Sequence, residues 1–172
     1  MPATRNRELG FDAAAQAFTA APVIKVVLAD DHAAVRRSLR RLLDREQGVV
    51  VCAEAVDLDS VIEHVIEQSP DVLVLDLRMP KGSSIDVIEQ LRRVAPGTEI
   101  VVLTMEDSPA FAQRSLEAGA VAFVLKEYAD VELVAAVRAA AAGELYLSPR
   151  IAKDLKAFRA VPSSLRDGRL GM

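Results

Sequence analysis

Five short apolar segments recur along the chain, and each is followed by a longer segment with helical periodicity. The apolar segments are four or five residues long, rich in β-branched residues, and nearly continuous rather than alternating. This pattern is typical of strands that are buried on both faces of a parallel sheet. The predicted strands lie at residues 24–28, 49–52, 72–75, 100–103 and 121–125.

The segments between the predicted strands repeat their apolar residues at helical spacing. In the first of them Val35, Leu39 and Leu43 fall on one face, and the arginines at 36, 37, 40 and 41 are interpreted as a solvated face. A strand–helix unit repeated five times predicts an α/β fold. We expect a doubly wound, five-stranded parallel sheet with helices on both faces, formed by residues 23–144.

Two tails flank this predicted domain. Residues 1–22 are rich in alanine and are predicted to be helical or disordered. In the second tail, residues 145–172, the pair Ser148-Pro149 is typical of a helix start, and the helix is predicted to run to about Arg159. From Ser148 onward this tail holds six basic and two acidic residues, whereas the chain as a whole has a net charge of −4. The body is therefore acidic and the C-terminal tail is basic.

Composition excludes several classes of protein. The net charge of −4 argues against nucleic-acid binding by bulk charge. A single cysteine, Cys52, excludes an intramolecular disulfide and a multi-cysteine zinc site. No apolar run approaches the ~20 residues that span a bilayer, and no signal peptide is recognisable. We therefore expect a cytoplasmic protein that makes no membrane contact.

Four of the predicted strands end in residues that carry chemistry. The first ends in Asp30-Asp31, the third in Asp76, the fourth in Thr104 and the fifth in Lys126. Because functional groups of such sheets gather at the carboxyl ends of the strands, we expect one shared crevice. Crowded carboxylates need a cation, and oxygen ligands at an exposed edge favour Mg²⁺. Mg²⁺ and a lysine would balance charge on a phosphoryl group, with an aspartate as nucleophile.

Sequence motifs around these strand ends resemble a known family. The motifs are LADDH at 28–32, VLDLRMP at 74–80, VLTM at 102–105, AGA at 118–120 and FVLK at 123–126. Together they resemble the receiver domain of bacterial two-component response regulators over residues 23–144. With GELYLSP at 143–149, they look most like the NarL/FixJ subfamily, whose members carry a LuxR-type output domain.

The resemblance implies a fold and a metal site. The fold is the flavodoxin- and CheY-like sheet with strand order 2-1-3-4-5. Asp76 matches the phosphoacceptor of the family. Asp31 and Asp76 match its direct Mg²⁺ ligands, and Asp30 matches a residue that acts mainly through water. The backbone carbonyl of Arg78 matches the third protein ligand.

The resemblance also implies a switch. Thr104 matches the switch hydroxyl, Lys126 the lysine that pairs with phosphate, and Phe123 the aromatic residue that turns inward on activation. The implied function is to accept a phosphoryl group from a sensor histidine kinase on Asp76 and to change conformation, with homodimerisation on phosphorylation. Only weak Mg²⁺-dependent autophosphorylation and autophosphatase activity are implied, so the protein is not expected to be a metabolic enzyme.

The sequence departs from the family pattern at three places. Ser84 stands where the family usually has glycine, so either the loop turns differently or Ser84 adopts an unusual backbone. Glu127 stands where proline is common. About 28 residues follow Glu144, whereas a helix-turn-helix unit needs roughly 50–65. We therefore expect no output domain here, DNA contact only through such a domain, and a linker helix in 145–172.

Other functions remain as alternatives. The chain could be a stand-alone receiver, or a receiver-like interaction module that never takes phosphate. Phosphohydrolases with an aspartate nucleophile need a second aspartate two residues later, where this chain has Arg78. A flavin or dinucleotide site is disfavoured because no glycine-rich loop follows the first strand.

Three residues are predicted to control the lifetime of an acyl phosphate. Arg78 follows Asp76 by two positions and Glu106 follows Thr104 by two, so both side chains should overhang the phosphoacceptor. We expect an Arg78–Glu106 pair, helped by the bulky Met105, to act as a lid that keeps water away from phosphorus.

Overall fold

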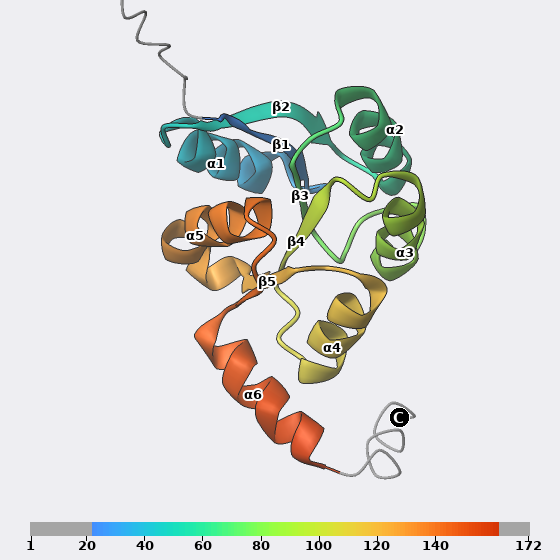
Figure 1. Ribbon diagram of the computed structural model, residues 1–172, viewed down its shortest axis with the longest axis vertical. Coiled ribbons are helices and arrows are strands. Elements are labelled where there is room, and N and C mark those ends of the chain that lie inside the picture. The colour runs from blue at the N-terminus through green and yellow to red at the C-terminus, as the bar shows by residue number, and fades with distance from the viewer. Residues whose placement is uncertain (1–21, 162–172) are drawn as a thin grey trace, which may run out of the picture.

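Six parallel strands form a single sheet in the order β2-β1-β3-β4-β5-β6. The computed structural model describes residues 22–161 (Figure 1). The strands are β1 (Ile24–Ala29), β2 (Val49–Ala55), β3 (Val72–Leu75), β4 (Glu99–Thr104), β5 (Ala122–Leu125) and β6 (Tyr146–Leu147). The predicted parallel α/β architecture is confirmed.

The prediction of five strands was wrong because it missed β6. This strand has only two residues, too few for any periodicity to be visible in the sequence. It is parallel to β5, and hydrogen bonds on either side hold it: the amide of Tyr146 donates to the carbonyl of Val121 at 3.0 Å, and that of Ser148 to the carbonyl of Phe123 at 2.9 Å. The sheet therefore continues beyond Glu144.

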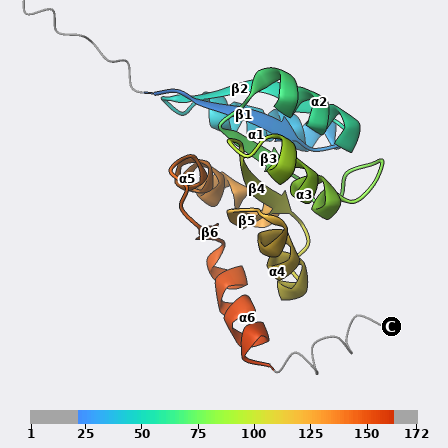
Figure 2. The same ribbon diagram turned by 45° about the vertical axis from the view of Figure 1, so that its right-hand side comes forward.

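Helices cover both faces of the sheet (Figures 1 and 2). On one face α1 (Ala33–Asp44) lies beside α5 (Ala129–Ala141), and the other face carries α2 (Leu58–Gln68), α3 (Ser84–Val94) and α4 (Pro109–Ala118). A short 3-10 helix, Lys126–Tyr128, precedes α5. Alternate strand residues enter opposite cores: Val27 packs with α2 and α3, whereas Val26 packs with α1 and α5. Burial on both faces explains why the strand segments are nearly continuous apolar runs.

A sixth helix, α6 (Pro149–Ala160), follows β6 and packs against α4 (Figure 2). It buries Ile151 and Leu155 and starts at Pro149 behind Ser148, which confirms the predicted helix. The prediction for residues 1–22 falls, apart from Pro22, outside the described residues, as does the end of the basic tail from residue 162. Within residues 22–161, no helix is long and apolar enough to cross a membrane.

Gly119 ends α4 with a φ of +121°, a backbone conformation that other residues rarely adopt. A Cβ placed there would lie 2.5 Å from Cγ of Arg92, whose guanidinium is held by Glu99 at 2.9 Å. We expect Gly119→Ala to lower the free energy of unfolding by about 1–3 kcal/mol, measured by urea denaturation. Gly97→Ala is the matched control, because a Cβ at Gly97 meets nothing within 4 Å. Equal losses in the two variants would contradict this explanation.

Candidate functional site

The ends of β1, β3 and β5 bring two carboxylates and one ammonium into direct contact. Asp30 and Asp76 follow Ala29 and Leu75, which are paired in the register of β1 and β3. Lys126 follows β5, and its Nζ lies 2.6 Å from Oδ2 of Asp30 and 2.7 Å from Oδ2 of Asp76. The predicted convergence of these three residues is therefore observed.

The contact between these groups is largely shielded from water. Asp30 is 1% exposed, Asp76 is 3% exposed, and the side chain of Lys126 is 11% exposed. Burial disfavours the charged ammonium, but the two carboxylates outweigh this effect, so the pKa of Lys126 is raised above its ordinary value. The stability that these contacts supply is present at neutral pH and is lost as the pH rises through that raised pKa.

Four residues at this edge have ligand atoms within 4.8 Å of one another: Asp30, Asp31, His32 and Asp76. Oxygen donors of this kind are the ligands that Mg²⁺ prefers. Oδ2 of Asp30 is buried and, among the described residues, lacks a partner with hydrogen-bond geometry despite its closeness to Lys126. Three carboxylates with one ammonium leave two negative charges, which a divalent cation would balance. The donor set therefore fits Mg²⁺.

The main chain around these carboxylates is held by local hydrogen bonds. The amide of His32 donates to Oδ1 of Asp30 at 2.7 Å, and the amide of Arg78 donates to Oδ1 of Asp76 at 3.1 Å. Arg78 thus lies beside the phosphoacceptor candidate, while its carbonyl as a metal ligand stays a prediction. His32 precedes α1, and its Nδ1 lies 2.8 Å from Oδ1 of Asp31.

The predicted switch residues lie on the neighbouring strands. Thr104 ends β4, is fully buried, and accepts a hydrogen bond from the amide of Glu106 at 3.2 Å. Phe123 is fully buried within β5. The hydroxyl oxygen of Thr104 is the acceptor in this bond, so its own O–H can still donate to a phosphoryl oxygen.

The predicted pair above the site is present as a contact. Nη2 of Arg78 lies 3.2 Å from Oε2 of Glu106, with the arginine side chain 73% exposed and the glutamate 22% exposed. Met105 is 69% exposed. The pair joins the loop after β3 to the loop after β4, and its effect on an acyl phosphate stays a prediction.

Ser84 plays a part that sequence reasoning missed. It is buried at the start of α3, and its hydroxyl lies 3.0 Å from the carbonyl oxygens of both Asp76 and Leu77, to which it donates. The strained backbone falls instead on Lys81, with a φ of 70°, and on Gly82, with a φ of 137°. Of the two expectations for this loop, the loop that turns differently is therefore correct. A hydroxyl residue at a glycine position, at the start of a helix, was the available signal.

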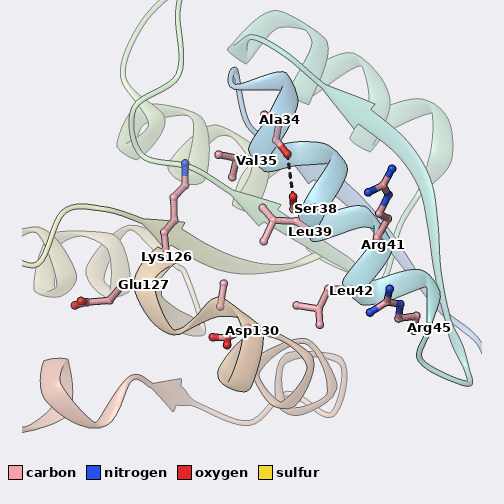
Figure 3. Close-up of a pocket in the computed structure, with 11 residues that line it drawn as sticks. Ala34, Val35, Ser38, Leu39, Arg41, Leu42, Arg45, Lys126, Glu127 and Asp130 are labelled. Atoms are coloured by element: carbon pink, nitrogen blue, oxygen red, sulfur yellow. Dashed lines mark hydrogen bonds between the residues drawn. The ribbon is translucent and has the colours of Figure 1, made fainter.

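An open groove of about 700 Å³ lies between α1 and α5 and reaches Lys126 (Figure 3). Its floor is apolar, with Leu39 and Leu42 from α1, and Arg41 and Asp130 lie at its sides. The site is therefore bordered by an accessible surface on the α1–α5 side.

Comparison with known proteins places these features in context. The family model for the response regulator receiver domain matches residues 26–138. The chain is similar to oxygen regulatory protein NreC of Staphylococcus epidermidis, with 36% identity over 133 residues, which make up 77% of this chain and 61% of that protein. The chain spans 56% to 62% of the length of the curated relatives that it matches.

Solved structures give the same result. A LuxR-family two-component response regulator from Aurantimonas sp. SI85-9A1 is similar with a TM-score of 0.77 and 35% identity, over 81% of this chain and 99% of that one. The isolated REC domain of RcsB from Salmonella enterica serovar Typhimurium, in the presence of phosphomimetic BeF3-, is similar with a TM-score of 0.72 and 30% identity, over 77% of this chain and 99% of that one.

Proposed function

Because the chain belongs to the response regulator receiver family, we propose that it accepts a phosphoryl group from a sensor histidine kinase on Asp76. The observation that carries the proposal is the contact of Lys126 with Asp76 beside two further carboxylates at the strand ends. In the transfer, a carboxylate oxygen of Asp76 forms a bond to phosphorus, and the bond from phosphorus to the kinase histidine nitrogen breaks.

The surrounding residues have separate roles in this proposal. Lys126 pairs with a phosphoryl oxygen, and the Thr104 hydroxyl, whose oxygen accepts from the amide of Glu106, donates its own proton to another. Asp30, Asp31, Asp76 and the Arg78 carbonyl would hold Mg²⁺, which when bound offsets charge on the transferring group. Rearrangement of Thr104 together with Phe123 is the conformational switch.

The proposal extends to the organisation of the chain. Residues 23–144 act as the receiver, and 145–172 as a linker helix and tail, although β6 ties the start of that segment to the sheet. Phosphorylation favours a homodimer, and control of transcription passes through a DNA-binding domain outside this sequence. The protein works in the cytoplasm, where it meets the kinase domain of its partner.

Acetyl phosphate tests the proposal without an identified kinase. The chain is incubated with acetyl phosphate, with and without Mg²⁺, and its intact mass is measured. We expect the mass of one phosphoryl group to be added only with Mg²⁺. No addition under either condition would favour the alternative function, a receiver-like interaction module that does not take phosphate.

The contact between Arg78 and Glu106 makes a prediction about phosphoryl lifetime. If the pair keeps water from phosphorus, Arg78→Asn and Glu106→Gln should both speed loss of the phosphoryl group. An exposed pair is worth ~0–1 kcal/mol, so we expect up to about a fivefold faster loss. Intact mass is followed after the donor is removed, and Arg93→Asn, an exposed arginine on α3, is the control. Variants no faster than the wild type would leave the lid without support.

A further inference from the structure

We propose that Arg36 is a positioning residue for the metal site, because it holds the main chain of Asp30 from α1. Arg36 is one of the arginines that the sequence pattern assigned to a solvated helix face. The structure separates it from the exposed Arg37 and Arg41: its side chain is only 14% exposed. This inference rests on the proposed function of the strand-end carboxylates.

The guanidinium of Arg36 makes one hydrogen bond and one longer ionic contact, and its Nε, among the described residues, has no hydrogen-bond partner. Its Nη1 donates to the backbone carbonyl of Asp30 at 2.6 Å, and its Nε lies 3.5 Å from Oε2 of Glu54, near the end of β2. Glu54 is itself held by Arg40, whose Nη1 donates to its Oε1 at 3.2 Å. The planar guanidinium can point one nitrogen at the carbonyl of Asp30 and another toward Glu54 of β2. Arginine provides this geometry and lysine does not.

The carbonyl that Arg36 holds belongs to a residue with several hydrogen bonds to its surroundings. β1 ends at Ala29, so Asp30 lies just past the strand and needs other anchors. Its amide donates to the carbonyl of Ala55 at 3.2 Å, and its Oδ1 accepts from the amide of His32 at 2.7 Å. Arg36 adds the third anchor, and together they set the direction in which the carboxylates of Asp30 and Asp31 leave the chain.

Position rather than charge is the expected contribution of Arg36. Arg36 and Arg40 share Glu54, and Arg40 also pairs with Asp44, so the two positive and two negative charges of this group largely cancel and the net field at the metal-site carboxylates is small. Groups that hold a metal ligand in place typically affect metal affinity by ~10–100-fold without touching the ion. Arg36 has this relation to the Asp30-Asp31 segment, in which Asp31 is the expected direct ligand and Asp30 acts mainly through water.

The test measures Mg²⁺ affinity of the full chain by isothermal titration calorimetry. We expect Arg36→Gln to weaken Mg²⁺ binding by ~10-fold, at the lower end of the range for such groups. Arg36→Lys should fall between this variant and the wild type, because an ammonium reaches one of the two acceptors. Arg37→Gln removes the same charge from an exposed position of α1 and should leave the affinity within about twofold of the wild type.

Phosphorylation at saturating Mg²⁺ separates positioning from damage to the fold. Arg36→Gln should then gain the full mass of one phosphoryl group, since only metal affinity is impaired, and Arg36→Lys serves the same purpose if the glutamine variant does not fold. Wild-type Mg²⁺ affinity in both Arg36 variants, or an equal loss in Arg37→Gln, overturns the inference. A wild-type chain that neither binds Mg²⁺ nor takes phosphate instead refutes the proposed function.

Discussion

Asp76→Asn should abolish phosphorylation by acetyl phosphate entirely, which is the largest effect expected of any single substitution in this chain. Of the two buried carboxylates that contact Lys126, Asp76 is the one at the end of β3, beside Arg78 on the following loop and Ser84 at the start of α3. The amide of asparagine is a far weaker nucleophile toward phosphorus than a carboxylate. Intact mass in the presence of Mg²⁺ gives the readout.

The same substitution should leave the fold in place. An asparagine oxygen can still accept from the amide of Arg78, and Lys126 keeps its contact with Asp30. Asp86→Asn, an exposed carboxylate in the first turn of α3, is the control and should be phosphorylated as the wild type is. Phosphoryl addition that persists in Asp76→Asn would show that another residue is the acceptor.

Much of the fold could be predicted because both faces of its strands are buried. Residues such as Val26 and Val27 belong to opposite cores, so the strands appear in the sequence as continuous apolar runs. β6 lacked this signal: Tyr146 and Leu147 are only half-buried, and the strand exists because the edge of β5 is available for pairing. A local pattern cannot reveal a two-residue strand that has no buried apolar run of its own.

The candidate site likewise contains residues that could be predicted from the sequence and residues that could not. Asp30, Asp76 and Lys126 could be placed together because the topology of a parallel sheet brings its strand ends to one edge. The roles of Arg36 and Ser84 could not be predicted, because each acts through a hydrogen bond from its side chain on a helix to a main-chain carbonyl oxygen at the end of a strand. The helical period assigned Arg36 to the solvated face, and only the packing of β2 beside α1 reveals that Glu54 draws it inward.

Electrostatics leads us to expect that the exposed carboxylate of the cluster, Asp31, contributes strongly to metal binding. Asp30 and Asp76 already share the ammonium of Lys126, whereas Asp31 faces solvent and its ion pair within residues 22–161 is with His32, at 2.8 Å. Without a divalent cation, the three carboxylates repel one another more than one ammonium can offset. We therefore expect bound Mg²⁺ to relieve repulsion among these carboxylates.

Asp31→Ala should accordingly abolish measurable Mg²⁺ binding and phosphorylation while making the metal-free protein more stable. Loss of a direct ligand should exceed the ~10–100-fold effect of losing an outer partner. Removal of one exposed negative charge should raise the free energy of unfolding in EDTA by up to about 1 kcal/mol, since the lost contact with His32 offsets part of the gain. Calorimetric titration with MgCl₂ and thermal melts in EDTA measure the two effects, with Asp86→Ala as the control. Unchanged Mg²⁺ affinity would remove Asp31 from the ligand set, and a lower melting temperature in EDTA would refute repulsion as the cause.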